Sequence, residues 1–333
     1  MNDVIVALAG GVGGAKLVLG LAHARPPEEV TAIVNTADDL TLYGLHVSPD
    51  LDTVMYTLAG LADPVRGWGV ASDTTHALDM LEHYGHPAWF RLGDRDLGTH
   101  LLRRELLDRG KTLTEVTAIL CRALGVRSAV LPMTDDPVRT RVLTPEGELE
   151  FQDYFVGRKA GVRVTGLRFA GIEKARPSGR VLEAIGRARA VVFCPSNPFV
   201  SLGPILALPG LAEAIRSSPG PKAAVSPILG GRALKGPAAK MMKELGEEPS
   251  ASAVARRYVD LLDAFVLDEV DRSDAETVER MGLRVLVTNT VMNTLEDKTR
   301  LGREVLEFLA EIARAGGRSS PSSAPAGRGP ASG

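Results

Sequence analysis

Hydrophobic residues along the chain fall into short continuous runs separated by amphipathic stretches. The run Val4-Ile5-Val6-Ala7-Leu8-Ala9 ends at glycines, and a helix-like stretch from Ala15 to about Ala22 follows it. The next run covers residues 30–34. Continuous apolar runs of this length are typical of strands that are buried on both faces. The chain is therefore predicted to open with a strand, a helix and a second strand parallel to the first.

Four helices are predicted after this unit, near residues 51–61, 74–84, 97–109 and 113–124. Asp73 stands before the second of these segments, and Thr112 or Thr114 stands at the start of the fourth. These residue types accept hydrogen bonds from the free N–H groups of a first helical turn. We therefore expect them to be N-caps.

The hydrophobic pattern changes from about residue 127. Two alternating segments, 138–143 and 148–156, flank the turn Thr144-Pro145-Glu146-Gly147, and residues 162–169 form a third. Alternation with a period of two predicts strands that are exposed on one face. We expect a small antiparallel β insertion over about residues 134–170.

Buried apolar runs then return at residues 190–193, 222–225, 264–267 and 284–287, each separated from the next by a helix-like segment. This order predicts an α/β protein with a Rossmann-like, doubly wound, mostly parallel sheet. Residues 1–315 are expected to form one such domain with the β insertion. Residues 316–333 lack large apolar side chains, and we expect this tail to be disordered.

Composition narrows the class of protein further. The 333 residues are 44% hydrophobic and 24% charged, which is ordinary for a globular protein. Lys and Arg number 39 and Asp and Glu 41, so no broad basic surface for nucleic acid is expected. The two cysteines have no metal-ligand spacing, and no apolar run reaches the roughly 20 residues of a membrane helix. We expect a reduced, cytoplasmic protein that binds neither nucleic acid nor membrane.

The first candidate site is the segment Gly10-Gly11-Val12-Gly13-Gly14-Ala15-Lys16, directly after the first strand. Glycines allow backbone N–H groups to approach an anion closely, and the following helix directs its positive end toward it. The spacing matches neither the GxGxxG dinucleotide motif nor a Walker loop. Phosphate binding by Gly11, Gly13, Gly14 and Lys16 is our interpretation, and a plain strand-to-helix turn is the alternative.

A second candidate site follows the second strand. Four carboxylates lie within 15 residues, near predicted strand or helix ends: Asp38, Asp39, Asp50 and Asp52. Carboxylates in this density suit a divalent cation or a sugar-like hydroxyl group. Alternatively, Ser48 caps the helix and the last two aspartates only oppose its dipole.

Two further loops follow later strands. Ser196 and Asn197 lie between two prolines after the strand at 190–193, and a stiff turn is the alternative to a ligand contact there. The segment after the strand at 222–225 contains Ser226, Gly230, Gly231, Arg232 and Lys235. This segment is predicted to form a second anion site, with a solvated basic loop as the alternative. Two anion sites indicate a diphosphate or two phosphate-bearing ligands.

Common hydrolytic chemistry is not supported by the sequence. The chain has no zincin pair of histidines and no GxSxG nucleophile motif. Residues 89–96 mix aromatic, basic and acidic side chains, and Arg91 there is a candidate for pairing with a phosphate or a planar ring.

Six segments together resemble the 2-phospho-L-lactate transferase family of deazaflavin coenzyme F-420 biosynthesis. They occur in order, and the similarity runs from about residue 3 to 313: GGVGGAK (Gly10–Lys16), TADD (Thr36–Asp39), SPDLDTV (Ser48–Val54), FRLGDRDLGTH (Phe90–His100), PSNP (Pro195–Pro198) and VSPILGGRALKGPAAK (Val225–Lys240). Six ordered motifs with compatible spacing are far more specific than one glycine loop.

This resemblance implies a Mg²⁺-dependent transferase. Such an enzyme moves a 2-phospholactyl or phosphoenolpyruvyl group from a guanosine diphosphate conjugate to a hydroxyl of the deazaflavin Fo and releases GMP. The family's deazaflavin-contacting residues match Asp50 and Arg91, and Asp50 is the expected catalytic residue. Asp50, with Asp38, Asp39 or Asp52, is expected to hold the metal. The guanosine diphosphate moiety is assigned to the glycine and basic loops: Gly11, Gly13, Gly14, Lys16, Ser196, Asn197, Ser226, Gly230, Gly231 and Lys235.

Two other functions fit parts of the pattern. A non-catalytic, nucleotide-sugar-binding regulator of related fold also carries a glycine loop but lacks the SPDLDTV-type motif. An NAD-dependent dehydrogenase is disfavoured by the missing third glycine. The sequence leaves open whether the donor carries lactate, phosphoenolpyruvate or a related acid. We expect a homodimer, because α/β enzymes of this size often form dimers.

Overall fold

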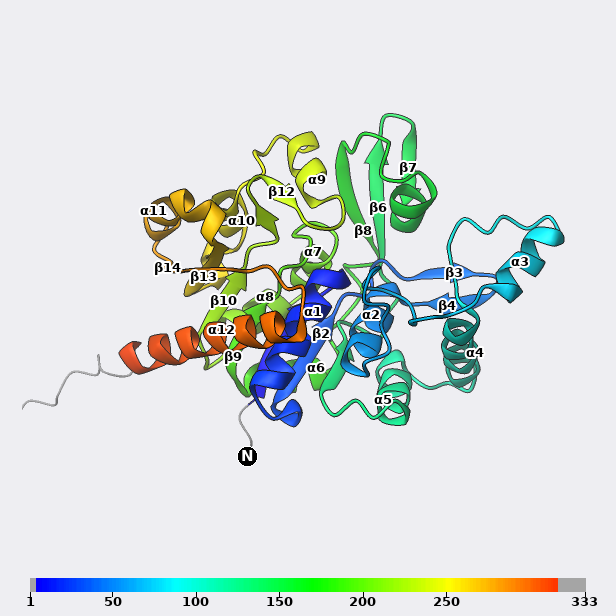
Figure 1. Ribbon diagram of the computed structural model, residues 1–333, viewed down its shortest axis with the longest axis horizontal. Coiled ribbons are helices and arrows are strands. Elements are labelled where there is room, and N and C mark those ends of the chain that lie inside the picture. Colours follow the sequence, from blue (N-terminus) through cyan, green and yellow to red (C-terminus); the bar gives the residue numbers. More distant parts are fainter. Residues whose placement is uncertain (1–3, 317–333) are drawn as a thin grey trace, which may run out of the picture.

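The computed structural model describes residues 4–316, and its centre is a sheet of seven parallel strands (Figure 1). Every neighbouring pair in the sheet is parallel, and the strand order is β14-β13-β10-β9-β1-β2-β5. The strands are β1 (Val4–Ala9), β2 (Val30–Val34), β5 (Ala129–Pro132), β9 (Ala188–Phe193), β10 (Lys222–Val225), β13 (Ala264–Asp268) and β14 (Arg284–Thr288). The chain runs from the middle to one edge and then returns beside β1, which is the Rossmann-like order. The predicted fold class is confirmed.

Helices cover both faces of this sheet. The α-helices of residues 4–316 are α1 (Gly11–Ala24), α2 (Pro49–Leu58), α3 (His76–His83), α4 (Asp94–Asp108), α5 (Leu113–Ala123), α6 (Gly179–Gly186), α7 (Leu202–Ala207), α8 (Leu211–Arg216), α9 (Ala238–Glu244), α10 (Ala251–Tyr258), α11 (Ala275–Glu279) and α12 (Leu295–Gly316). Of these, α3 lies away from the central sheet, next to α4 (Figure 1). Alternate residues of β1 enter different cores, because Val6 and Leu8 pack on one face and Ile5 and Ala7 on the other. This double burial explains why the strand reads as an unbroken apolar run.

The predicted strands of the central sheet were found at nearly the predicted residues, but β5 was missed. It has only four residues, it lies at the edge of the sheet, and it ends in a proline. An edge strand is buried less than a central one, so its sequence carries a weaker apolar signal.

The predicted cap of the fourth helix is confirmed, and the cap of the second is corrected. Thr112 forms a capping box with Glu115 at the start of α5. The Asp73 carboxylate instead accepts from the N–H groups at the start of α4, while Asp94 accepts from those at the start of α3. The two helix starts are neighbours, so each carboxylate caps the other segment's helix.

Antiparallel structure is present in the predicted insertion. Strands β6 (Arg139–Thr144), β7 (Gly147–Glu150) and β8 (Gly166–Ala170) form a small sheet that projects beyond the central one (Figure 1). The strand predicted to extend to residue 156 ends at 150, and a π-helical turn over Asp153–Gly157 follows. Two hairpins were not predicted: β3 (Leu40–Leu42) with β4 (Leu45–Val47), and β11 (Ile228–Leu229) with β12 (Arg232–Ala233).

The remaining expectations concern the C-terminal tail and membrane helices. The tail was predicted to be disordered from residue 316, and residues 317–333 lie outside the described residues. Among the helices of residues 4–316, none is both long enough and apolar enough to cross a membrane.

Candidate functional site

A cavity of about 660 Å³ opens at the carboxyl ends of the parallel strands. Its wall includes the residues that follow β1, β9 and β10, and the start of α2. Strand order reverses between β1 and β9, and ligands of open α/β sheets bind at such a switch point. The volume lies within the usual range for ligand pockets. We therefore take this cavity as the candidate site.

The glycine segment forms the first turn of α1 and not a separate loop. A Cβ on Gly13 would lie 2.4 Å from the Pro195 carbonyl oxygen, and one on Gly14 would lie 2.5 Å from Ser196 Oγ. Glycine is therefore needed so that α1 can pack against the segment after β9. Gly11 and Gly13 line the cavity as predicted, whereas Gly14 is buried against the neighbouring segment and does not line it.

Two of the N–H groups at this helix start are already bonded within the protein. Gly10 N–H donates to Ser196 Oγ at 3.1 Å, and Gly11 N–H donates to Asp50 Oδ1 at 2.8 Å. The following N–H groups of a first helical turn have no acceptor within the helix. The start of α1 thus keeps donors and a positive dipole end that suit an anion.

Two lysines line the cavity. Lys16 Nζ donates to the Met292 carbonyl at 2.7 Å, and Lys235 Nζ donates to the Arg66 carbonyl at 2.6 Å. Burial, with the nearby charges of Lys235 and Lys298, lowers the pKa of Lys16. Neither cavity lysine forms an ion pair with a residue that the structure describes. A carbonyl partner leaves the positive charge uncompensated, so both groups favour an anionic ligand.

Gly230 and Gly231, assigned to the predicted second anion site, lie outside the candidate site, and Gly231 borders a separate, smaller pocket with Arg232, Lys240 and Lys243. These residues have φ of +53° and +74° and form the two-residue turn between β11 and β12. Gly230 N–H donates to the Asp271 carboxylate at 3.0 Å, and neither glycine lines the cavity. The glycine pair serves the geometry of a hairpin. Of the two basic residues in this loop, Lys235 lines the candidate site and Arg232 does not.

Three predicted polar residues line the cavity but already have hydrogen-bond partners within the protein. Ser226 Oγ donates to the Ile228 carbonyl, and Asn197 Oδ1 accepts from the Phe199 N–H. Ser196 Oγ donates to the Gly10 carbonyl. These side chains fix the shape of the loops that carry the cavity wall.

Asp38 and Asp50 form a buried pair joined by Asn35. The Asn35 amide nitrogen lies 3.0 Å from Asp50 Oδ2 and 3.1 Å from Asp38 Oδ2. Burial raises the pKa of Asp50 to about 6 and, together with the Asp50 charge, raises that of Asp38 well above its ordinary value. Asp38 Oδ1 is buried without a hydrogen-bond partner. Both residues line the cavity.

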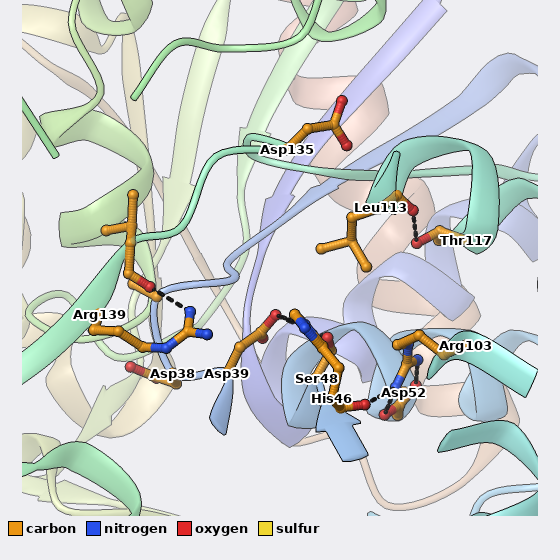
Figure 2. A network of polar contacts seen from close by, with 12 residues as sticks. Asp38, Asp39, His46, Ser48, Asp52, Arg103, Leu113, Thr117, Asp135 and Arg139 are labelled. Atoms are coloured by element: carbon orange, nitrogen blue, oxygen red, sulfur yellow. Dashed lines mark hydrogen bonds and ion pairs between the residues drawn. The ribbon is translucent and has the colours of Figure 1, made fainter. Parts of the chain in front are cut away.

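The other two aspartates have protein partners (Figure 2). Asp39 Oδ2 accepts from Ser48 Oγ at 2.8 Å and lies 2.9 Å from His46 Nε2. Asp52 forms a two-contact ion pair with the buried Arg103. Asp39 Oδ1 is buried without a partner, as Asp38 Oδ1 is, but Asp39 does not line the cavity. Asp52 lines the cavity and is already paired with Arg103. Ser48 begins α2, but its hydroxyl serves Asp39 and not the helix.

The protein side chains alone do not complete a Mg²⁺ site, so oxygen atoms of a bound ligand would have to complete it. Within residues 4–316, no group of three or more His, Cys, Asp or Glu side chains is arranged to hold a metal ion. Mg²⁺ usually binds through one or two carboxylates plus substrate phosphates and water. Asp50 and Asp38, with an unpartnered oxygen on Asp38, meet that requirement.

Arg91 is exposed at the cavity, where it forms no hydrogen bond or ion pair with the described part of the chain. Sequence reasoning missed a polar group beside it: Tyr56, Asp96 and His100. The i,i+4 spacing of Asp96 and His100 within the segment Phe90–His100 was the available signal. It places both side chains on one face of α4. The Phe151 and Phe155 rings, stacked 5.5 Å apart, add an apolar wall that no motif had indicated.

The fold and the cavity together define a Rossmann-like α/β protein with a candidate site at the carboxyl ends of its parallel strands. The sequence model described as 2-phospho-L-lactate transferase CofD matches residues 5–307. The chain belongs to this family.

Similar proteins support this assignment. A phosphoenolpyruvate transferase from Streptomyces griseus subsp. griseus is 44% identical over 92% of this chain and 99% of that protein. A 2-phospho-L-lactate transferase from Methanosarcina mazei is 39% identical over 91% of this chain and 99% of that protein. A crystal structure of a UPF0052 family protein from Bacillus halodurans covers 92% of this chain and 99% of its own, with a TM-score of 0.62. At 18% identity, that structure supports the fold alone.

Proposed function

We propose that this protein transfers a 2-phospholactyl or phosphoenolpyruvyl group from its guanosine diphosphate conjugate to a hydroxyl of the deazaflavin Fo, with release of GMP. The observation that carries the proposal is the arrangement of the cavity. The start of α1, two lysines without ion pairs and a buried carboxylate pair all face it. The names of the relatives at about 40% identity point to the same reaction. A cytoplasmic location and a homodimer stay predictions.

Transfer of a substituted phosphate requires alignment and charge neutralisation more than covalent help from the protein. We assign the diphosphate of the donor to the start of α1 and to Lys16 and Lys235. Mg²⁺, held by Asp50 and Asp38, would supply further neutralisation of the diphosphate charge. These groups favour the negative charge that builds up on the leaving phosphate.

The attacking group is the terminal hydroxyl of the Fo side chain. Its oxygen bonds to the phosphorus that bears the lactyl or enolpyruvyl group, while the bond from that phosphorus to the GMP oxygen breaks. We assign the hydroxyl proton to the Asp50 carboxylate, which lines the cavity at the start of α2. Arg91, exposed at the cavity, is assigned to the deazaflavin ring.

The test is a transfer assay with purified protein, Mg²⁺ and Fo. The lactyl and the enolpyruvyl conjugates of guanosine diphosphate are supplied separately, and GMP and the phosphodiester product are measured by mass spectrometry. We expect equal amounts of both products with at least one donor. The proposal would be overturned if protein that still binds GDP formed neither GMP nor the phosphodiester with each of the two donors.

A nucleotide-sugar-binding regulator is the alternative function from another class. The named relatives give it no support, because those at about 40% identity are transferases. Thermal-shift measurements with GDP, NAD and a nucleotide sugar separate the alternatives, because a ligand that binds the native state raises its stability. We expect stabilisation by GDP.

A further inference from the structure

A buried polar network joins α2 to α4 at one side of the cavity. Tyr56 Oη lies 2.7 Å from Asp96 Oδ1, and Asp52 pairs with Arg103 one helical turn earlier on α2. His100 lies between these two contacts, 3.8 Å from Asp52 and 3.3 Å from Asp96. The function proposed above assigns no role to this network. Because burying charged groups is costly, a network of this kind is expected to serve a purpose beyond stability.

The two ring nitrogens of His100 face different members of the network. Arg103 Nη1 lies 3.1 Å from His100 Nδ1, and a guanidinium can only donate, so Nδ1 is the acceptor. His100 Nε2 lies 3.3 Å from Asp96 Oδ1 but forms no hydrogen bond within the described residues. Tyr56 donates to Asp96 Oδ1, and His100 Nε2 lies beside the same oxygen.

Asp96 is consequently held by one oxygen only. Oδ2 forms no hydrogen bond or ion pair with any side chain or backbone group in the described part of the chain. The side chain keeps 13% exposure, and Asp96 lines the cavity. Burial opposes ionisation, but His100, Tyr56 and Arg103 outweigh it and lower the pKa of Asp96. Asp96 is thus an ionised carboxylate with one oxygen that is available to a ligand.

The surrounding charge indicates which kind of ligand group this oxygen accepts. Asp50, Asp52 and Asp96 all line the cavity, and α2 and α4 carry them. A carboxylate repels phosphate oxygens, so this side of the cavity favours a neutral hydrogen-bond donor. A guanine base offers two adjacent N–H groups that engage both oxygens of a carboxylate, and Oδ1 is already occupied. A single hydroxyl group fits one free oxygen better.

We propose that Asp96 is a specificity-determining residue, and that its Oδ2 accepts a hydrogen bond from a hydroxyl group on the polyhydroxy chain of the acceptor substrate. This inference rests on the proposed function. Tyr56, which holds Asp96, stands six residues after Asp50 on α2, about 9 Å along the helix axis. An extended chain whose terminal hydroxyl reaches Asp50 therefore passes along α2 toward Asp96.

The test uses calorimetric titration of full-length protein with Fo and, separately, with GDP. We expect Asp96→Asn to weaken Fo binding at least tenfold, because a charge-assisted bond is lost, and to leave GDP binding within twofold. Asp108→Asn is the matched control, because Asp108 lies on the exposed face of α4 and pairs only with Arg104. This control should leave both affinities unchanged.

A second ligand identifies the contacting group. A deazaflavin ring with a hydroxyl-free alkyl chain should bind wild-type protein at least tenfold more weakly than Fo, and Asp96→Asn should bind it as well as wild type does. The inference would be overturned if Asp96→Asn bound Fo as tightly as wild-type protein does. It would also be overturned if the variant lost as much affinity for the hydroxyl-free ligand as for Fo. Weakened GDP binding would assign Asp96 to the base instead. If wild-type protein binds no Fo, the proposed function itself fails.

Discussion

The Gly11 N–H donates a 2.8 Å hydrogen bond to Asp50 Oδ1, although 39 positions separate the two residues in sequence. This bond joins the first turn of α1 to the first turn of α2, so two positive helix ends meet at one place. A Cβ on Gly10 would lie 2.6 Å from the Asp50 carboxylate. The Asp50 carboxylate therefore requires glycine in this segment, just as a bound ligand would.

Asp50→Asn is predicted to lower transfer at least 10²-fold, equal to about 2.7 kcal/mol of transition-state stabilisation. The melting temperature at pH 7 should change little, because relief from burying a charge offsets the weaker bonding to Gly11 and Asn35. The measurement pairs thermal melting with single-turnover transfer across a Mg²⁺ titration. A destabilised variant with normal turnover would return Asp50 to a capping role.

The same variant tests the pKa of Asp50. Burial raises it from 3.8 to about 6, so the folded state binds the proton more tightly than the unfolded state. The stability that this proton contributes is fully present below about pH 4 and is lost as pH rises through 6. Urea unfolding should therefore show wild-type protein losing stability relative to Asp50→Asn between pH 4 and 7. A constant difference would refute the raised pKa.

Lys16→Ala and Lys235→Ala are each predicted to weaken GDP binding by about 1.5–3 kcal/mol, the usual contribution of a charge-assisted hydrogen bond. Both ammonium groups bond only to carbonyl oxygens among the described residues, so their removal leaves no carboxylate unpaired. Titration with GDP gives the dissociation constants, and the exposed Lys111→Ala serves as the control. The proposed anion site would be excluded if both affinities matched those of wild-type protein.

Gly13→Ala should cost about 1–3 kcal/mol of stability, because its Cβ would lie 2.4 Å from the Pro195 backbone oxygen. Gly98→Ala, on the exposed face of α4, has no atom within 4 Å of the added Cβ. That variant should gain about 0.5–1 kcal/mol from helix propensity. Urea unfolding of both variants checks the contrast. Equal effects would show that the close approach of α1 to the segment after β9 is unimportant.

Arg103→Met is predicted to destabilise the protein by about 3–5 kcal/mol, because it leaves the Asp52 carboxylate buried without its partner. The double variant Asp52→Leu with Arg103→Met should recover most of that loss, since an apolar pair removes the uncompensated charge. Unfolding in urea measures both. Retained Mg²⁺ dependence of transfer in the double variant would agree with Asp52 not being a metal ligand.

The sequence alone determined the parallel sheet and the loops that surround the site. Strands buried on both faces must be apolar at every position, so β1, β2 and β9 were visible as unbroken runs. Because parallel strands end at one edge, the order of these runs assigned the motifs that follow them to one region. Lys16, Lys235 and Asp50 do line a common cavity.

Tertiary structure decided which residues in those motifs face the cavity. Gly14 and Gly230 both look like anion-binding glycines in the sequence. In the structure, Gly14 is required by close packing against Ser196, and Gly230 is required by a hairpin turn. Asp52 looked equivalent to Asp50 until the fold placed Arg103 beside it, 51 positions further along the chain. Partners this distant leave no local pattern, because a side chain's charge environment depends on which elements pack together.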